Sequence, residues 1–177
     1  MLIKSALLHH HESRQWLSFK QPVAVLHARE PIKVLPLLNE IEARVEAEKL
    51  TAVGYVTYEA ANGLDASLPT HPPHEDALPM ISFTLFRYAH AVQGPTPAQA
   101  QAHQLWRFSE SAEDYQLAIH RIRERIKAGD VYQINQTTRL NGVLNDPWQL
   151  FTEVAIGAPF GAYLQGDSHT IVSASPE

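Results

Sequence analysis

The side chains of Gln133, Asn135 and Thr137 form the row best suited to chemistry in this chain, because they recur at every second residue. Successive side chains of a β-strand point to opposite faces, so a strand over residues 131–140 would turn all three to one face. A primary amide both donates and accepts hydrogen bonds, so the row suits a polar, oxygen-rich ligand. An outer sheet face that contacts only water is the alternative interpretation, since antiparallel sheets commonly have one.

A carboxylate, Glu177, follows a strand predicted over residues 169–174 and the short segment Ser175-Pro176. A glutamate whose pKa is raised by burial acts as a general acid or base in many enzymes. An ordinary carboxylate at the end of a strand is the alternative interpretation.

The histidines are numerous but poorly spaced for a metal site. His9, His10 and His11 form a run, and His71 and His74 lie in a proline-rich stretch. Because no cysteine or carboxylate stands at ligand spacing from them, we expect solvated loop histidines and no metal site.

The predicted strand 131–140 follows directly on an amphipathic helix. Ser111 and Asp114 resemble a capping pair, which predicts a helix from Ala112 to Ala128. Gly129 then ends the helix, because glycine adopts a positive φ at little cost. The apolar residues that share one face of this helix are Tyr115, Ala118, Ile119, Ile122 and Ile126.

The other predicted elements indicate an α+β fold of mainly antiparallel sheets with flanking helices, since no βαβ period recurs. Further strands are predicted over 2–8, 22–28, 51–59, 80–88 and 160–165, and further helices over 32–50 and from Asp146-Pro147 to about 156. Pro22 suggests an edge position or a strand start. The apolar stripe predicted for the helix 32–50 comprises Val34, Leu35, Leu38, Ile41 and Val45. The short Gly166-Asp167 turn makes 160–165 and 169–174 an antiparallel pair. We expect a loop over 61–79 and a linker over 91–104.

Composition excludes several classes of protein. Of the 177 residues, 45% are hydrophobic, which favours a globular chain, and the net charge of −5 gives no support for a nucleic-acid partner. No cysteine is present, so disulfides and cysteine-based metal sites are excluded. No stretch approaches the roughly 20 apolar residues of a membrane helix, and no secretory leader is recognisable, so we expect a cytoplasmic protein without a membrane partner.

Three segments together resemble the chorismate-utilising enzymes, and most closely the component I chains of aminodeoxychorismate (para-aminobenzoate) synthases. Residues 54–61 read Gly-Tyr-Val-Thr-Tyr-Glu-Ala-Ala and are similar to a segment of that family's N-terminal region. Residues 128–140 contain a Gly-Asp-x-Tyr-Gln-x-Asn motif. Residues 159–177, from Pro-Phe-Gly-Ala-Tyr-Leu to Ser-Ala-Ser-Pro-Glu, resemble the entry to the catalytic half.

The resemblance implies an enzyme that takes chorismate and ammonia from a glutamine amidotransferase subunit or fused domain, and forms 4-amino-4-deoxychorismate for folate synthesis. Glu177 would then be the general acid/base that helps the C4 hydroxyl leave. Gln133, with Asn135 beside it, would lie near the substrate ring. Isochorismate synthases carry a water-activating lysine where Gln133 stands, and since an amide is no base, amination is favoured over hydration.

The resemblance also implies that the chain is the N-terminal portion of a longer enzyme, and an incomplete part of the family's two-sheet fold. Residues 1–104 would form the N-terminal region, and residues 105–177 the beginning of the chorismate-binding domain. Magnesium is the implied cofactor, with its ligands and a catalytic lysine expected beyond residue 177. Two alternatives remain: component I of anthranilate synthase, and a non-catalytic binding module that lacks the catalytic half.

Overall fold

The computed structural model describes residues 2–74, 77–97 and 106–176, which form two compact units. The first unit comprises residues 1–98 and 147–177, and the second comprises residues 99–146. Both contain antiparallel strand pairs and helices, so the predicted α+β class is confirmed. The boundary predicted between residues 104 and 105 lies outside the described residues, as does part of the predicted linker.

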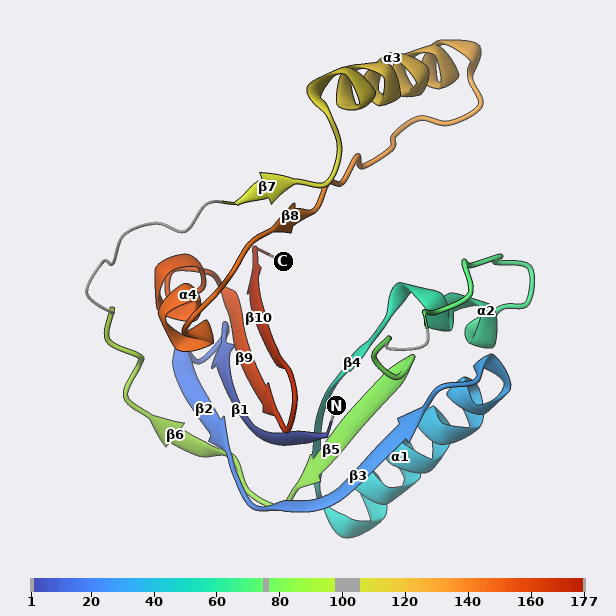
Figure 1. Ribbon diagram of the computed structural model, residues 1–177. Coiled ribbons are helices and arrows are strands. Elements are labelled where there is room, and N and C mark those ends of the chain that lie inside the picture. The colour runs from blue at the N-terminus through green and yellow to red at the C-terminus, as the bar shows by residue number, and fades with distance from the viewer. Residues whose placement is uncertain (1, 75–76, 98–105, 177) are drawn as a thin grey trace. The chain divides into compact units, whose positions relative to one another are not determined.

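Two antiparallel sheets build the first unit (Figure 1). The five-stranded sheet has the order β10-β9-β1-β2-β6, and the three-stranded sheet has the order β3-β5-β4. The strands of the first sheet are β1 (Ile3–His10), β2 (Gln15–Phe19), β6 (His90–Val92), β9 (Phe160–Gly166) and β10 (Thr170–Ser175). Those of the second are β3 (Pro22–Ala28), β4 (Thr51–Val56) and β5 (Ile81–Phe86). The strand that Pro22 opens is therefore an edge strand, as predicted.

Helices lie on the outer sides of these sheets. Figure 1 shows α1 (Val34–Glu48) on the outer side of the three-stranded sheet and α4 (Pro147–Val154) on the outer side of the five-stranded sheet. Short helical turns connect the strands: η1 (Pro31–Lys33), η2 (Tyr58–Ala60) and α2 (Ala61–Leu64). The second unit contains β7 (Arg107–Phe108), α3 (Ala112–Ala128) and β8 (Leu140–Asn141). In the part of the chain that the structure describes, no helix has the length and apolar character needed to cross a membrane.

The main core of the first unit lies between its two sheets. Its buried members come from five strands: Ile3, Ala6, Phe19, Val53, Phe86 and Leu164. One polar group joins them, because the buried Thr84 hydroxyl donates to the Ile3 carbonyl oxygen at 2.9 Å. The two sheets are thus connected by apolar burial and by a satisfied buried hydrogen bond.

The N-terminal end of β1 is shaped by a register shift against β9 between Ile3 and Ser5. Such a bulge changes the alternation of side chains, which explains why Ile3 and Ala6, three residues apart, both face the core. Beyond it, the Leu2 backbone N–H donates to Asp167 Oδ1 at 3.1 Å. This hydrogen bond holds the pKa of the Asp167 carboxyl below its usual value.

Several sequence predictions need correction in the first unit. Leu35, placed on the apolar stripe of α1, is 48% exposed, and Leu37 packs against the core instead. Leu37 follows Val34 by three residues, whereas Leu35 is turned about 100° away from it. The strand predicted over 51–59 ends at Val56, where η2 follows. β2 was not predicted, because its apolar residues lie on both of its faces and show no alternation.

Gly54 is a position where any side chain would collide with the sheet. A Cβ atom there would lie 2.2 Å from the Ser82 carbonyl oxygen and 2.6 Å from the Phe83 ring. We expect Gly54→Ala to lower the free energy of unfolding by about 1–3 kcal/mol, because the β5 backbone must move. Gly157→Ala is the matched control, since no described residue other than its chain neighbours lies within 4 Å of its added Cβ. Urea unfolding followed by tryptophan fluorescence would measure both, and equal stabilities would contradict the collision.

Candidate functional site

The second unit holds the polar row that the sequence singled out, and α3 leads into it. The Ser111 hydroxyl accepts a hydrogen bond from the Asp114 backbone N–H at 3.0 Å, and donates to Asp114 Oδ2 at 2.8 Å. This cap satisfies one of the free N–H groups at the helix start. The predicted helix from Ala112 to Ala128 and its cap are therefore confirmed.

The helix ends in a conformation that turns the chain sharply. Gly129 has φ 80°, the left-handed region that the sequence predicted for it. The Gly129 N–H donates to the Ile126 carbonyl, and the Asp130 N–H donates to the Arg125 carbonyl, both at 3.1 Å. This is a Schellman-type end. Arg125 also pairs with the Asp130 carboxylate at 2.7 Å, but both side chains are largely exposed, so the pair adds little stability.

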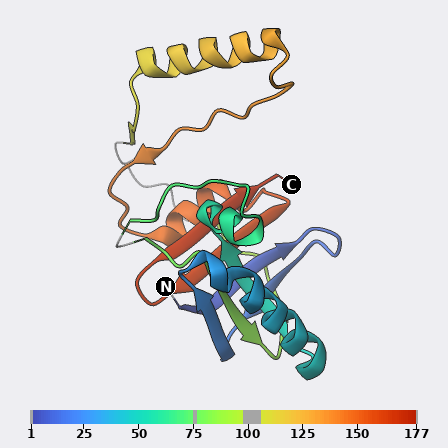
Figure 2. The same ribbon diagram turned by 90° about the vertical axis from the view of Figure 1, so that its right-hand side faces the viewer.

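Residues 131–139 are irregular rather than a β-strand, and the prediction of a strand over 131–140 is wrong for all but Leu140. Figure 2 shows the chain leaving α3 and running back in the opposite direction to β8. A strand needs a neighbouring strand for its backbone hydrogen bonds, and none of the described residues supplies one along 131–138. Tyr132 is 94% exposed in consequence.

Gln133 and Asn135 nevertheless lie side by side. The Gln133 Nε2 donates to Asn135 Oδ1 at 3.1 Å, and both side chains are exposed. In this arrangement Gln133 Oε1 remains to accept a hydrogen bond from a ligand, and Asn135 Nδ2 remains to donate one. The structure brings these two predicted site residues together, while Thr137 makes no side-chain hydrogen bond to them among the described contacts.

The far end of the segment is held by a short antiparallel pair. Phe108 of β7 faces Leu140 of β8, and the Ser109 N–H donates to the Arg139 carbonyl at 2.9 Å. The Arg139 N–H in turn donates to the Ser109 hydroxyl at 3.3 Å. Gln133 and Asn135 therefore lie on a segment whose two ends are held by hydrogen bonds. The backbone between these ends pairs with no described strand.

The third predicted site residue, Glu177, lies outside the described residues. The structure places the residues before it: β10 runs to Ser175, which pairs with Phe160 of β9. β10 forms one edge of the five-stranded sheet. The antiparallel pairing predicted for this hairpin is confirmed.

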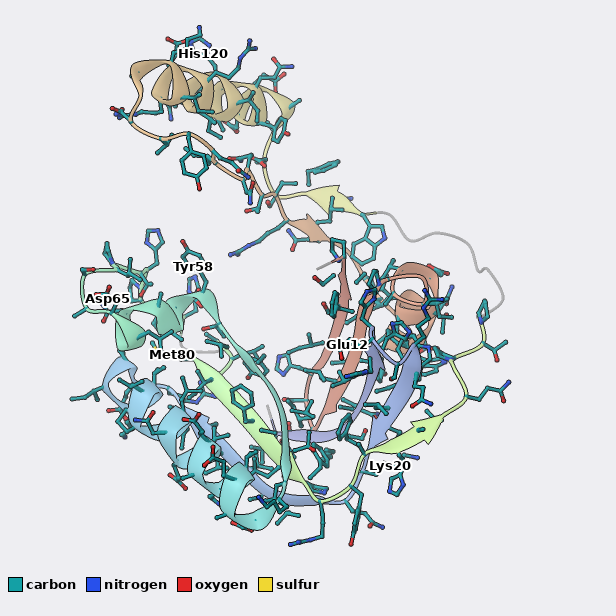
Figure 3. The ribbon with its side chains drawn as sticks, turned by 180° about the vertical axis from the view of Figure 1, so that it is seen from behind. Glu12, Lys20, Tyr58, Asp65, Met80 and His120 are labelled. Atoms are coloured by element: carbon teal, nitrogen blue, oxygen red, sulfur yellow. The ribbon has the colours of Figure 1, made fainter. Side chains whose placement is uncertain are left out.

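The Gly-Tyr-Val-Thr-Tyr-Glu segment lies in β4 and η2 of the first unit. Tyr55 packs against the core, and burial raises the pKa of its hydroxyl. Tyr58 is 86% exposed on η2, where Figure 3 labels it. The two tyrosines of one motif thus have opposite environments.

The prediction of solvated loop histidines is wrong for His9, which is half-buried in β1, whereas His11 lies exposed in the turn after that strand, as predicted. His9 and His10 belong to β1, and His9 packs against Trp16 with ring centroids 5.0 Å apart. Because a carbonyl only accepts, the His9 Nδ1–H donates to Pro159 O at 2.7 Å. No group of three potential metal-binding side chains occurs in the described ranges.

A groove on the outer face of the five-stranded sheet was missed by sequence reasoning. It combines side chains of β1, β9 and α4 with Lys20, which follows β2. These side chains come together only through the pairing register of strands that are distant in sequence. No local sequence pattern could therefore predict that they share a groove.

Comparison with known families assigns the class of protein. The profile of the family described as chorismate binding enzyme matches residues 4–177. The chain therefore belongs to the chorismate binding enzyme family.

Individual relatives are similar over parts of their length. Aminodeoxychorismate synthase component 1 of Klebsiella aerogenes is 32% identical over 90 residues, which cover 49% of this chain and 20% of that protein. Its namesake from Escherichia coli (strain K12) is 33% identical over 75 residues, which cover 41% and 17%. Anthranilate synthase alpha subunit 1, chloroplastic, of Oryza sativa subsp. indica is 28% identical over 155 residues, which cover 81% and 26%. The matches thus span about a fifth to a quarter of these relatives.

The unpaired backbone of residues 131–138 has a measurable consequence. We expect its amides to exchange with deuterated solvent about 10³-fold faster than those of β5, which is hydrogen-bonded on both sides. Hydrogen-exchange mass spectrometry of the chain would measure this difference. Protection of 131–138 equal to that of β5 would show that the segment is a paired strand after all.

Proposed function

We propose that this chain works as part of a longer enzyme that aminates chorismate at C4 and forms 4-amino-4-deoxychorismate for para-aminobenzoate and folate synthesis. The ammonia comes from a glutamine amidotransferase, as a subunit or a fused domain, and the reaction takes place in the cytoplasm. The observation that carries the proposal is the similarity to two aminodeoxychorismate synthase components at 32% and 33% identity.

The amide pair supports this reaction over hydration of the ring. Amination replaces the C4 hydroxyl with an amino group, so water leaves and no base is needed to activate a water molecule. Gln133 is an amide and accepts no proton from water at neutral pH. Its oxygen and the Asn135 amide group are suited to bind hydroxyl and carboxylate groups of the substrate.

Glu177 would deliver the proton that departs with the C4 hydroxyl. Hydroxide is a poor leaving group, so a positioned carboxyl group accelerates the step by protonating its oxygen in the transition state. The carboxylate that results would then accept a proton from the ammonium group formed when ammonia bonds to C4.

Magnesium, the cofactor that the family resemblance implies, would supply charge neutralisation at a substrate carboxylate. It prefers several oxygen ligands in octahedral geometry. The described residues contain no group of three His, Cys, Asp or Glu side chains that could hold a metal ion, and we expect the magnesium ligands beyond residue 177. We therefore assign the ion no step among residues of this chain.

Anthranilate synthesis is the second candidate. The relative from Oryza sativa subsp. indica covers 81% of this chain, more than either aminodeoxychorismate synthase component does. Both reactions begin with chorismate and ammonia, so the product distinguishes them.

The product of the longer protein decides between the two. Incubated with chorismate, ammonium and Mg²⁺, it should form 4-amino-4-deoxychorismate, which a lyase converts into 4-aminobenzoate. Chromatography with fluorescence detection separates 4-aminobenzoate from anthranilate. Anthranilate formed without the lyase would refute the proposed reaction and support the second candidate.

The role of Glu177 is tested by Glu177→Gln in the same protein. We expect turnover to fall by about 10²-fold or more, the usual contribution of a general acid or base, with the fold unchanged. Glu12→Gln is the matched control, because Glu12 lies exposed in the turn after β1 (Figure 3). Equal turnover of the two variants would remove Glu177 from the mechanism.

A further inference from the structure

A groove of about 410 Å³ lies on the outer face of the five-stranded sheet, entirely within the first unit. This volume is within the range of about 300–1,000 Å³ that small-molecule sites occupy. The residues lining it are Ser5, Ala6, Leu7, Ser18, Lys20, Trp148, Tyr163 and Gln165.

The strand register explains why polar and aromatic side chains share this groove. Leu7 faces Ser18 on β2 and Tyr163 on β9, while Ser5 faces Gln165. Side chains two residues apart on a strand point the same way. Ser5 and Leu7 of β1 therefore line the same face as Tyr163 and Gln165 of β9.

One wall of the groove is aromatic and well supported. Trp148 and Tyr163 meet edge to face, with centroids 5.2 Å apart and an interplanar angle of 85°. Phe151 contacts both rings, at 5.2 and 5.3 Å, and is fully buried. Trp148 itself is 37% exposed. The wall thus presents part of a fixed indole to solvent, where a flat ring can stack.

The other end of the groove is polar and carries one positive charge. The Ser5 hydroxyl donates to Gln165 Oε1 at 3.3 Å, which leaves the Gln165 amide group to donate outward. Lys20 is exposed where the chain leaves β2, as labelled in Figure 3, and forms no ion pair with any described residue. Among the described residues, no carboxylate lines the groove. This end is suited to a single negative charge.

From these features we propose that the groove binds a small aromatic monocarboxylate. The ring stacks on Trp148, and the carboxylate lies toward Lys20, Ser18 and Gln165. A carboxylate accepts hydrogen bonds from all three of these groups, and Lys20 supplies the matching charge. The groove and the amide pair of Gln133 and Asn135 belong to different compact units. None of the residues proposed to act on chorismate lines the groove, so the proposed site does not depend on the reaction assigned to them.

Benzoate is the probe that tests the proposal on the 177-residue chain. We expect saturable binding with a dissociation constant of about 1 mM or tighter in titration calorimetry. In NMR spectra the Trp148 indole N–H signal should shift while that of Trp106 stays in place. Absence of saturation up to about 10 mM benzoate would overturn the proposal.

Two comparisons, one of lysine variants and one of ligands, test whether the groove recognises the carboxylate charge and the aromatic ring. Lys20→Gln should weaken benzoate binding by about fivefold or more, whereas Lys4→Gln, an exposed lysine of β1 outside the groove, should leave it unchanged. Benzamide, which keeps the ring without the charge, and cyclohexanecarboxylate, which keeps the charge without the aromatic ring, should both bind more weakly. Equal affinity of the two lysine variants, or of benzoate and benzamide, would overturn the assignment.

Discussion

The antiparallel pairing of β1 with β9 is the interaction on which the rest of the first unit depends. It joins strands about 160 residues apart in sequence, with Leu7 opposite Tyr163 and Leu8 opposite Ala162. One face of this pair contributes Ile3 and Leu164 to the core between the sheets, where each fully buried aliphatic side chain contributes about 1.5–3 kcal/mol. The opposite face carries Leu7 and Tyr163, which pack against residues of α4 and line the groove. A single register therefore positions both the core and the candidate binding surface.

The second unit is organised differently, by local interactions. A capped start and a left-handed stop define α3, and a two-residue strand pair holds the segment that follows. None of the residues of α3 is buried, and no described strand pairs with 131–138. The polar side chains that we propose bind the substrate thus lie on backbone that local contacts hold only at its ends. A substrate, or further protein surface packed against them, would supply the missing hydrogen-bond partners.

Membership of the chorismate binding enzyme family limits the chemistry, but the reaction depends on a few side chains. The proposal that Gln133 favours amination over hydration rests on an amide not being a base, and this argument holds whether or not its segment is a strand. The similar proteins include aminodeoxychorismate synthase components and an anthranilate synthase subunit, at 28–33% identity over different lengths of the chain. Reactions on a shared fold are distinguished by the residues that contact the substrate ring and its leaving group. The rest of the fold binds the features that the substrates share.

The sequence by itself determined the features that depend on near neighbours. The helix cap was predicted from Ser111, the helix end from Gly129, and the edge strand from Pro22. Capping and φ preferences act within a few residues, so the local sequence is enough to predict them. It also predicted that Gln133 and Asn135 lie side by side, although it did so from a strand that the structure does not contain. It could not show that residues 131–139 lack a strand partner, that Leu37 rather than Leu35 packs inward, or that Lys20 shares a groove with Trp148. Those outcomes were decided by tertiary structure, because backbone pairing and register join residues whose separation in sequence leaves no local signal.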